Sequence, residues 1–105
     1  MQRGEVWWAD LPQPIGRRPV LLLSRNSAYR VRVSVTVAPI SRTVRGIPVE
    51  VPLSRQDGLP TDCAVNLDDV MTIPKALLRR QITTLSAEKM VDVVAALTFA
   101  LDLDR

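Results

Sequence analysis

The feature of this sequence that most constrains its fold is a run of alternating side chains over residues 31–37. Valine occupies every second position, and arginine, serine and threonine occupy the positions between. A period of two places successive side chains on opposite faces of a strand, so this run predicts a strand with one buried and one polar face. A second alternating run over residues 47–53 contains Pro48 and Pro52, which cannot donate ladder hydrogen bonds. It is therefore predicted as an edge strand.

Shorter apolar runs predict further strands, separated by loops rich in proline and glycine. Strands are expected over residues 5–9, 19–24, 63–71 and 81–85, loops over residues 10–18, 39–46 and 56–62, and a helical turn over residues 74–80. The strand at 31–37 is expected to continue to Pro39. Five or six short strands with a terminal helix predict a mainly β, partly open barrel that forms one domain over residues 1–105.

The terminal helix is predicted from its first residue, because Ser86 is a favourable N-cap. The helix should then run to about Leu101. Its packing stripe is expected to consist of Met90, Val94, Leu97 and Leu101, which recur at helical spacing. Phe99 falls outside this stripe, so we expect it on the exposed side of the helix.

The absence of histidine narrows the chemistry that this chain can perform. Without an imidazole there is no histidine acid–base pair and no histidine metal ligand, and the single cysteine, Cys63, allows neither an intrachain disulfide nor a cysteine zinc site. No metal ion and no cofactor is therefore expected. No apolar run reaches the roughly 18–20 residues of a membrane span, and residues 1–5 lack a signal-peptide core, which predicts a cytoplasmic protein without a membrane partner.

Positive charge is concentrated in the N-terminal half of the chain. Residues 1–56 carry nine arginines and three acidic residues, a net charge of +6, whereas residues 57–105 carry a net charge of −3. Arginine presents a planar fork of donors that matches phosphate, so this half favours a polyanionic partner such as RNA or DNA. A general preference for arginine over lysine in composition is the alternative explanation.

Three polar segments at predicted strand ends gather the side chains suited to such a partner. If the strands over 19–24 and 31–39 pair antiparallel, Arg18 and Ser41 lie at the same end and can face one phosphate. Trp8 can stack on a base. Each of these residues also has a purely structural interpretation. Trp8 can belong to the core, Arg18 can be a solvated loop residue, and Ser41 can be a turn residue. Asp68 can be a solvated carboxylate at a strand end. The candidate residues are Trp8, Gly16, Arg17, Arg18, Ser41, Arg42, Thr43, Arg45, Asn66 and Asp68.

Ordered motifs along nearly the whole chain resemble the MazF/PemK family of toxin endoribonucleases. They are Arg3-Gly4-Glu5-Val6-Trp7-Trp8, Arg18-Pro19-Val20, Ala38-Pro39-Ile40-Ser41, Asp62-Cys63-Ala64-Val65, Thr72-Ile73-Pro74-Lys75 and Ile82-Thr83-Thr84-Leu85-Ser86. The resemblance implies an SH3-like or CcdB-like barrel with a C-terminal α-helix and a homodimer. It also implies sequence-specific, metal-independent cleavage of single-stranded mRNA at short motifs, which leaves 2′,3′-cyclic phosphate and 5′-hydroxyl ends, and neutralisation by a cognate antitoxin.

The resemblance also implies roles for individual residues. Arg18 corresponds to the family's catalytic arginine, and Ser41 stands where the family usually has threonine, with Thr43 as the reserve candidate. Asp68 corresponds to a carboxylate that serves as base in some members, and it would need burial to raise its pKa. Asn66 replaces an arginine of those members. The RNA-binding set is expected to be Trp8, Gly16, Arg17, Arg42, Thr43, Arg45 and Asn66. The alternative function is a non-catalytic module on the same barrel, either gyrase-inhibitor-like or nucleic-acid-binding.

Overall fold

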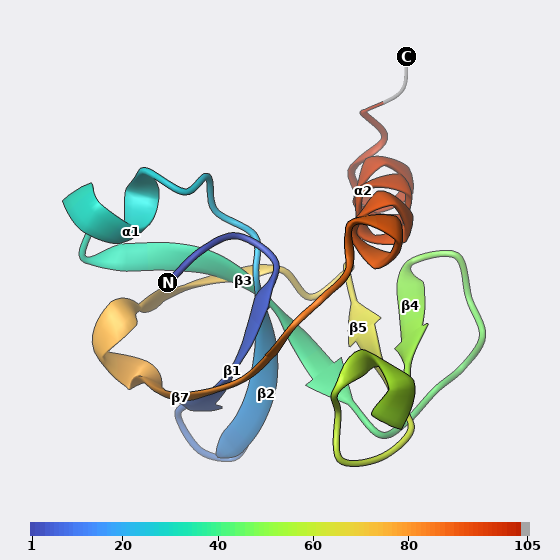
Figure 1. Cartoon of the computed structure of the whole chain (residues 1–105), viewed down its shortest axis with the longest axis horizontal. Helices are drawn as coiled ribbons and strands as arrows, with labels where there is room; N and C mark the ends of the chain where they lie inside the picture. The colour runs from blue at the N-terminus through green and yellow to red at the C-terminus, as the bar shows by residue number, and fades with distance from the viewer. Residues whose placement is uncertain (104–105) are drawn as a thin grey trace.

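Strand β3 (Ser34–Ser41) lies at the centre of the sheet in a computed structural model that describes residues 1–103 (Figure 1). One edge of β3 pairs antiparallel with β2 (Arg17–Leu22). The other edge has two partners in succession, because residues 34–37 pair with β6 (Met71–Pro74) and residues 40–41 pair with β5 (Cys63–Asn66). The central strand therefore belongs to two sheet regions that diverge along its length.

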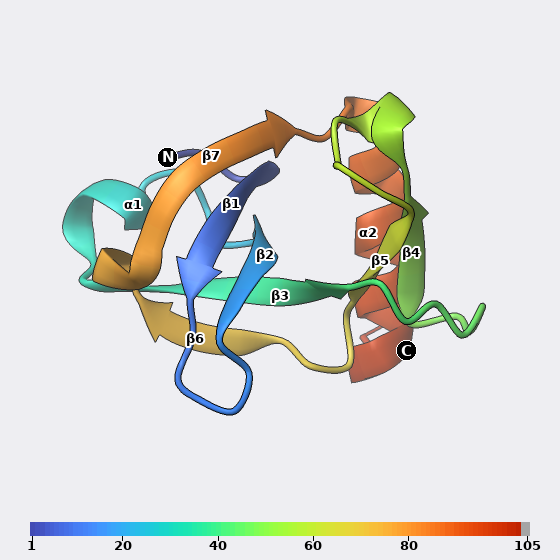
Figure 2. The same ribbon diagram turned by 90° about the horizontal axis from the view of Figure 1, so that it is seen from below.

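Each region is completed by further antiparallel strands. On one side β2 is followed by β1 (Glu5–Asp10) and then by β7 (Leu78–Thr84), and on the other side β5 is followed by β4 (Glu50–Leu53). Figure 2 shows β7, β1, β2, β3 and β6 curling round, while helix α2 (Ala87–Leu101) stands against β4 and β5. The curl does not close, which confirms the predicted partly open, mainly β barrel with a C-terminal helix.

The two faces of the curved sheet each bury a hydrophobic core. One core lies against α2 and contains Leu21, Ile40, Val65 and Val93. The other lies inside the curl and includes Val20, Val35 and Val37. Alternation along β2 and β3 therefore supplies both cores from the same strands, because successive side chains point to opposite faces.

The predicted strand over residues 31–37 is correct only from Ser34 onward. Helix α1 (Ala28–Val31) occupies its start, with the Arg32 amide donating to the Ala28 carbonyl. Val31 and Val33 are 72% and 83% exposed and belong to neither core. The helical turn supplies hydrogen bonds to the backbone before the strand begins. The alternating pattern therefore starts two valines, Val31 and Val33, before the buried part of the strand.

Other predicted boundaries also shift in the structure. The strand predicted over 63–71 is interrupted by a turn in which the Asn66 carboxamide accepts the Asp68 amide, so β5 ends and β6 begins separately. The predicted edge strand is confirmed as an edge, but only Glu50–Leu53 is extended. Short 3₁₀ turns occupy Arg55–Asp57 (η1) and Lys75–Leu77 (η2).

Helix α2 begins as predicted, because the Ser86 hydroxyl accepts the Lys89 amide at 3.1 Å. Its buried face is centred on Val93 and Ala96. The predicted packing stripe is therefore wrong in part, since Val94 and Leu101 are 46% and 55% exposed. Phe99 is exposed, as predicted. Small Ala96 allows the helix to approach the sheet on this face. Within residues 1–103 no helix is long and apolar enough to cross a membrane.

Candidate functional site

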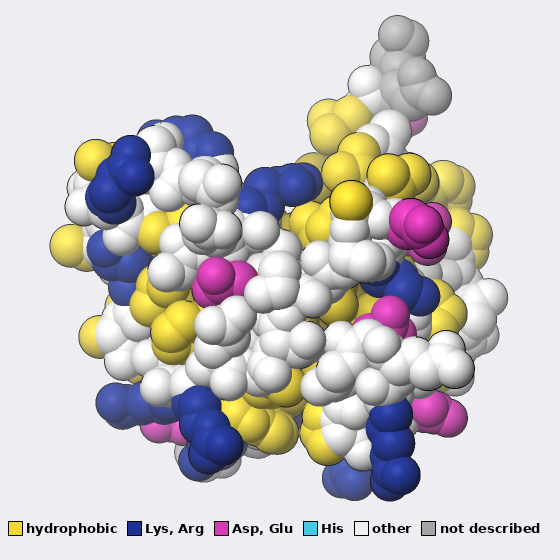
Figure 3. Space-filling model, in the orientation of Figure 1, with side chains coloured by type: hydrophobic (Ala, Val, Ile, Leu, Met, Phe, Trp, Pro, Cys, Tyr) yellow, Lys and Arg dark blue, Asp and Glu magenta, His cyan; other side chains and the backbone are white. Residues whose placement is uncertain are grey.

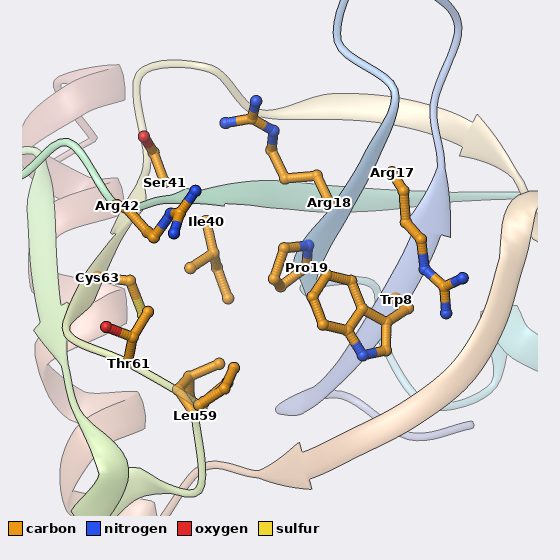
Figure 4. A pocket seen from close by; sticks show the side chains of 11 residues that line it. Trp8, Arg17, Arg18, Pro19, Ile40, Ser41, Arg42, Leu59, Thr61 and Cys63 are labelled. Atoms are coloured by element: carbon orange, nitrogen blue, oxygen red, sulfur yellow. The ribbon is translucent and has the colours of Figure 1, made fainter.

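Arg18 and Ser41 lie close together where β2 begins and β3 ends. The two strands pair in a register that sets Val20 opposite Pro39, and continuing it by two residues brings Arg18 opposite Ser41. Both side chains are half-buried. Figure 4 shows them on the same side of β3, pointing away from Ile40 and Leu59. The juxtaposition predicted from antiparallel geometry is therefore present.

The guanidinium of Arg18 contains a donor without an acceptor. Its Nε atom is buried, and no atom of residues 1–103 accepts a hydrogen bond from it. A buried, unsatisfied donor destabilises the protein by about 1–3 kcal/mol, so native proteins seldom keep one without a functional reason. The Arg18 Nε–H can donate a hydrogen bond to an oxygen acceptor, and hydrogen bonds from arginine are strongest when that oxygen is anionic.

The hydroxyl of Ser41 is oriented by the backbone that follows it. Ser41 Oγ accepts the amide of Thr43 at 3.1 Å, which occupies one of its lone pairs and leaves its own proton available to donate. Thr43 is exposed and lines neither of the two clefts described below. The geometry therefore favours Ser41 over Thr43 as the hydroxyl beside Arg18.

Two clefts meet at Arg18 and Ser41. The aromatic cleft, of about 520 Å³, has an apolar floor and wall formed by Trp8, Pro19, Ile40, Leu59 and Pro60. The polar cleft, of about 630 Å³, is lined by Ile15, Pro39, Arg45, Asn66, Asp68, Asp69, Val70 and Met71. Arg18 and Ser41 line both, so they form the ridge between a site suited to a base and a site suited to polar groups.

Trp8 presents part of its ring to the aromatic cleft. The indole is half-buried, and the guanidinium carbon of Arg17 lies 5.3 Å from the ring centroid, within the range of a cation–π contact. Arg42 lines the same cleft beyond Ser41. Gly16, in contrast, lines neither cleft, and its backbone closes the turn between β1 and β2 through bonds to Leu11 and Pro12.

The loop that carries Arg42 and Arg45 is held by a residue that the sequence interpretation missed. Glu50 is buried at the start of β4, and its Oε1 accepts the amides of Arg45 at 2.8 Å and Gly46 at 3.0 Å. The Arg45 guanidinium lies 4.0 Å from Oε2. A signal was present in the sequence, because Glu50 is the only acidic residue between Asp10 and Asp57.

Asp68 lies in the polar cleft with Arg18 and Ser41, but its environment differs from the one predicted. The base hypothesis required a buried carboxylate, and the Asp68 side chain is exposed. Its position is set by the turn in which Asn66 Oδ1 accepts the Asp68 amide at 2.8 Å. Asp69 lines the same cleft and is also exposed.

Two further observations bear on the chemistry of the site. Cys63 borders the aromatic cleft but is buried, and burial together with the charges of Asp62 and Asp57 raises the pKa of its thiol. A protonated thiol is a poor nucleophile. Among residues 1–103 no group of three or more carboxylate, cysteine or histidine side chains could hold a metal ion.

Arginine side chains line both clefts, Arg17 and Arg42 the aromatic one and Arg45 the polar one. Figure 3 shows basic side chains along the lower edge of the molecule, over the ends of β1, β2 and β7 and near η1, with hydrophobic side chains between them. Within residues 1–103 Arg18 lacks an anionic partner, and it lies between an apolar and a polar cleft, an arrangement whose chemistry suits an extended polyanion.

Comparison with known proteins identifies the family. A family model described as PemK-like, MazF-like toxin of type II toxin-antitoxin system matches residues 2–101. The chain belongs to this family of toxins. It is 40% identical over 104 residues to the probable endoribonuclease MazF5 of Mycobacterium tuberculosis, covering 98% of this chain and 94% of that one. It is 30% identical to the endoribonuclease MazF of Staphylococcus epidermidis, covering 99% and 93%.

Solved structures agree with this assignment. The Mycobacterium tuberculosis toxin MazF-mt6 superposes with a TM-score of 0.88 at 39% identity, covering 96% of this chain and 99% of that one. A mycobacterial endoribonuclease in complex with its cognate antitoxin superposes with a TM-score of 0.90 at 30% identity, covering 100% and 98%. The predicted family, fold class and enzyme class, an endoribonuclease, are thereby confirmed.

Proposed function

We propose that this endoribonuclease cleaves single-stranded mRNA at the ridge formed by Arg18 and Ser41, without a metal ion. The observation that carries the proposal is the buried Nε of Arg18, which has no acceptor in the described part of the chain. A phosphate placed on the ridge supplies that acceptor once the half-buried Arg18 side chain turns its Nε toward the clefts. Its two neighbouring nucleotides then extend into the aromatic and polar clefts.

The reaction uses the 2′-hydroxyl of the RNA as nucleophile. The O2′–P bond forms, the P–O5′ bond breaks, and the products are a 2′,3′-cyclic phosphate and a 5′-hydroxyl end. Negative charge grows on the non-bridging phosphate oxygens, where the Arg18 guanidinium and the Ser41 hydroxyl donate hydrogen bonds. A preorganised donor of this kind contributes about 3–4 kcal/mol to transition-state stabilisation.

Two proton transfers complete the reaction. The O2′ proton passes to Asp68, which is exposed in the free protein and becomes buried only when RNA fills the polar cleft that it shares with Arg18 and Ser41. The leaving O5′ takes a proton from water. Asp69 lines the same cleft and provides a matched control, so Asp68→Asn should lower kcat more than Asp69→Asn does. Equal losses in the two variants would remove Asp68 from the scheme.

The RNA contacts that we propose follow the two clefts. Trp8 stacks on a base, Arg17, Arg42 and Arg45 neutralise phosphates, and Asn66 offers its carboxamide to the nucleotide in the polar cleft. Because Gly16 lines neither cleft, we assign it a supporting role in the turn before Arg17. Thr43 orients the Ser41 hydroxyl through its amide.

The partners that we propose are a cognate antitoxin and a second copy of the chain. An antitoxin would neutralise the toxin by occupying the clefts, and one mycobacterial relative has been solved with its cognate antitoxin. A homodimer is supported by the apolar side chains that α2 leaves exposed, among them Val91, Val94 and Leu101. The cytoplasm is the compartment that we propose, because mRNA is translated there.

The test is cleavage of a mixed RNA pool by purified protein in EDTA, followed by analysis of the fragment ends. We expect cyclic phosphate and 5′-hydroxyl ends. Arg18→Ala should reduce the rate about 10²–10³-fold while the protein remains folded. Ser41→Ala should reduce it, whereas Thr43→Val, which keeps the Thr43 amide, should not.

Three outcomes of the same assay would contradict parts of the proposal. Cleavage that appears only when magnesium is added would contradict the metal-free mechanism. Binding without any fragments would favour the alternative, a non-catalytic module that acts on a protein or holds nucleic acid. Activity in Ser41→Ala equal to that of the wild type would exclude Ser41 from catalysis.

A further inference from the structure

The aromatic cleft continues beyond Trp8 into a third depression, the distal cleft. It has a volume of about 330 Å³ and is lined by Trp8, Gly58, Leu59, Pro60, Arg80, Gln81 and Ile82. Trp8, Leu59 and Pro60 line both clefts, so the indole and the 59–60 segment form their common border. The hollow that begins at Arg18 and Ser41 therefore extends across β1 and reaches β7.

Strand register places Arg80 in line with the floor of the aromatic cleft. Trp8 on β1 is the Cα partner of Pro19 on β2 and of Arg80 on β7. Directly opposed residues of antiparallel strands project from the same face of the sheet. Adjacent strands lie about 4.8 Å apart, so the Arg80 backbone is about 10 Å from that of β2, which carries Arg18.

Arg80 carries an exposed charge that no neighbour neutralises. No ion pair or hydrogen bond links its side chain to any residue within 1–103. The preceding residue, Arg79, behaves differently, because its Nε lies 2.7 Å from Asp10 Oδ2. Adjacent residues on one strand thus supply one paired and one unpaired guanidinium, and only the unpaired one borders the distal cleft.

We propose that the distal cleft binds the nucleotide next to the base held at Trp8, on the side away from Arg18, with Arg80 contacting its phosphate. This inference rests on the proposed function and extends its substrate site by one position. A single RNA strand fits because a base can stack at Trp8 while the backbone passes over β1 to Arg80. Arg18 at one end of this path and Arg80 at the other would each donate hydrogen bonds to a phosphate of the same strand.

The proposal is tested with 2′-O-methyl oligonucleotides, which bind but lack the attacking hydroxyl. Affinity is measured by fluorescence anisotropy for a dinucleotide, which spans only the polar and aromatic clefts, and for a decanucleotide pool across a salt series. Arg80→Gln is compared with Arg79→Gln, which changes the net charge equally. We expect Arg80→Gln to weaken decanucleotide binding several-fold and to reduce the slope of log K against log salt by about 0.7, the value for one phosphate contact on a single strand.

Dinucleotide binding should be unchanged in Arg80→Gln, and Arg79→Gln should match the wild type in both series. Wild-type affinity and slope for Arg80→Gln with the decanucleotides would overturn the inference while leaving RNA cleavage by the wild type, and hence the proposed function, intact. Equal losses with both lengths would place Arg80 elsewhere and also overturn it. If the wild type neither binds nor cleaves RNA, the proposed function itself fails.

Discussion

Replacing Glu50 by alanine should release the loop that carries Arg42 and Arg45. In the folded protein one oxygen, Oε1, accepts two consecutive amides, those of Arg45 and Gly46, at 2.8 and 3.0 Å. The Glu50 side chain is 3% exposed, so water competes little for these bonds. The carboxylate therefore fixes the backbone on which both cleft arginines are mounted.

The size of the effect follows from these contacts. A hydrogen bond to a charged group contributes about 1.5–3 kcal/mol, but both donors belong to exposed residues that water reaches once the carboxylate is removed. We therefore expect Glu50→Ala to lower the free energy of unfolding by about 2 kcal/mol, which lowers Tm by about 8 °C in a domain of this size. Glu50→Gln keeps an acceptor oxygen at the Oε1 position and should lose about half as much.

Thermal unfolding and RNA cleavage kinetics test the two parts of this prediction. Because Arg18 and Ser41 are held by β2 and β3, Glu50→Ala should raise KM by more than it lowers kcat. Glu50→Gln should restore most of the affinity. Glu88→Ala, which removes an exposed acid from α2, controls for the change in net charge. A wild-type Tm in Glu50→Ala, or a fall in kcat at constant KM, would refute the assigned role.

Gly58→Ala should destabilise the protein more than Gly46→Ala does. Both glycines have left-handed φ angles, +95° and +68°, which cost an alanine about 1–2 kcal/mol, but only at Gly58 would the new methyl lie within 2.7 Å of Thr83 Cβ. Denaturant midpoints measure the difference. Burial raises the pKa of Tyr29 to about 12, so the contribution of Tyr29 to the free energy of unfolding should be complete below pH 10 and should be lost as pH rises through about 12. Tyr29→Phe should reduce the loss of stability between pH 9 and pH 11.5, measured by urea unfolding, while losing the hydrogen bond to the Ser24 carbonyl; the part due to Cys63, whose pKa is also raised, should persist.

Local chemistry made several elements predictable from sequence. The Ser86 cap, the alternation that forms β3 and the antiparallel geometry that brings Arg18 to Ser41 all depend on residues near one another in the chain or on one strand pair. The alternation is a periodic pattern and the cap is a single side chain, and both can be recognised directly in the sequence.

Features that depend on distant partners were not predictable in the same way. Glu50 gains its role only when the chain folds back on Arg45, and Arg80 differs from Arg79 only because Asp10 lies beside one of them. The exposure of Asp68 and the helical turn before β3 likewise depend on how neighbouring segments pack. Pattern alone assigns residues to faces, whereas pairing and burial decide which of them remain available to a ligand.

The buried Nε of Arg18 has no hydrogen-bond acceptor in the described part of the chain, so the protein is less stable than a variant with an apolar side chain at this position would be. A leucine or methionine at that position would bury similar volume and remove an unmet donor, which is worth about 1–3 kcal/mol. Such a variant should melt at a higher temperature and cleave RNA about 10²–10³-fold more slowly, as is expected for Arg18→Ala. Selection for thermal stability alone would therefore replace this arginine, and under the proposed function the stability gained by the substitution equals the stability that the chain loses by keeping Arg18.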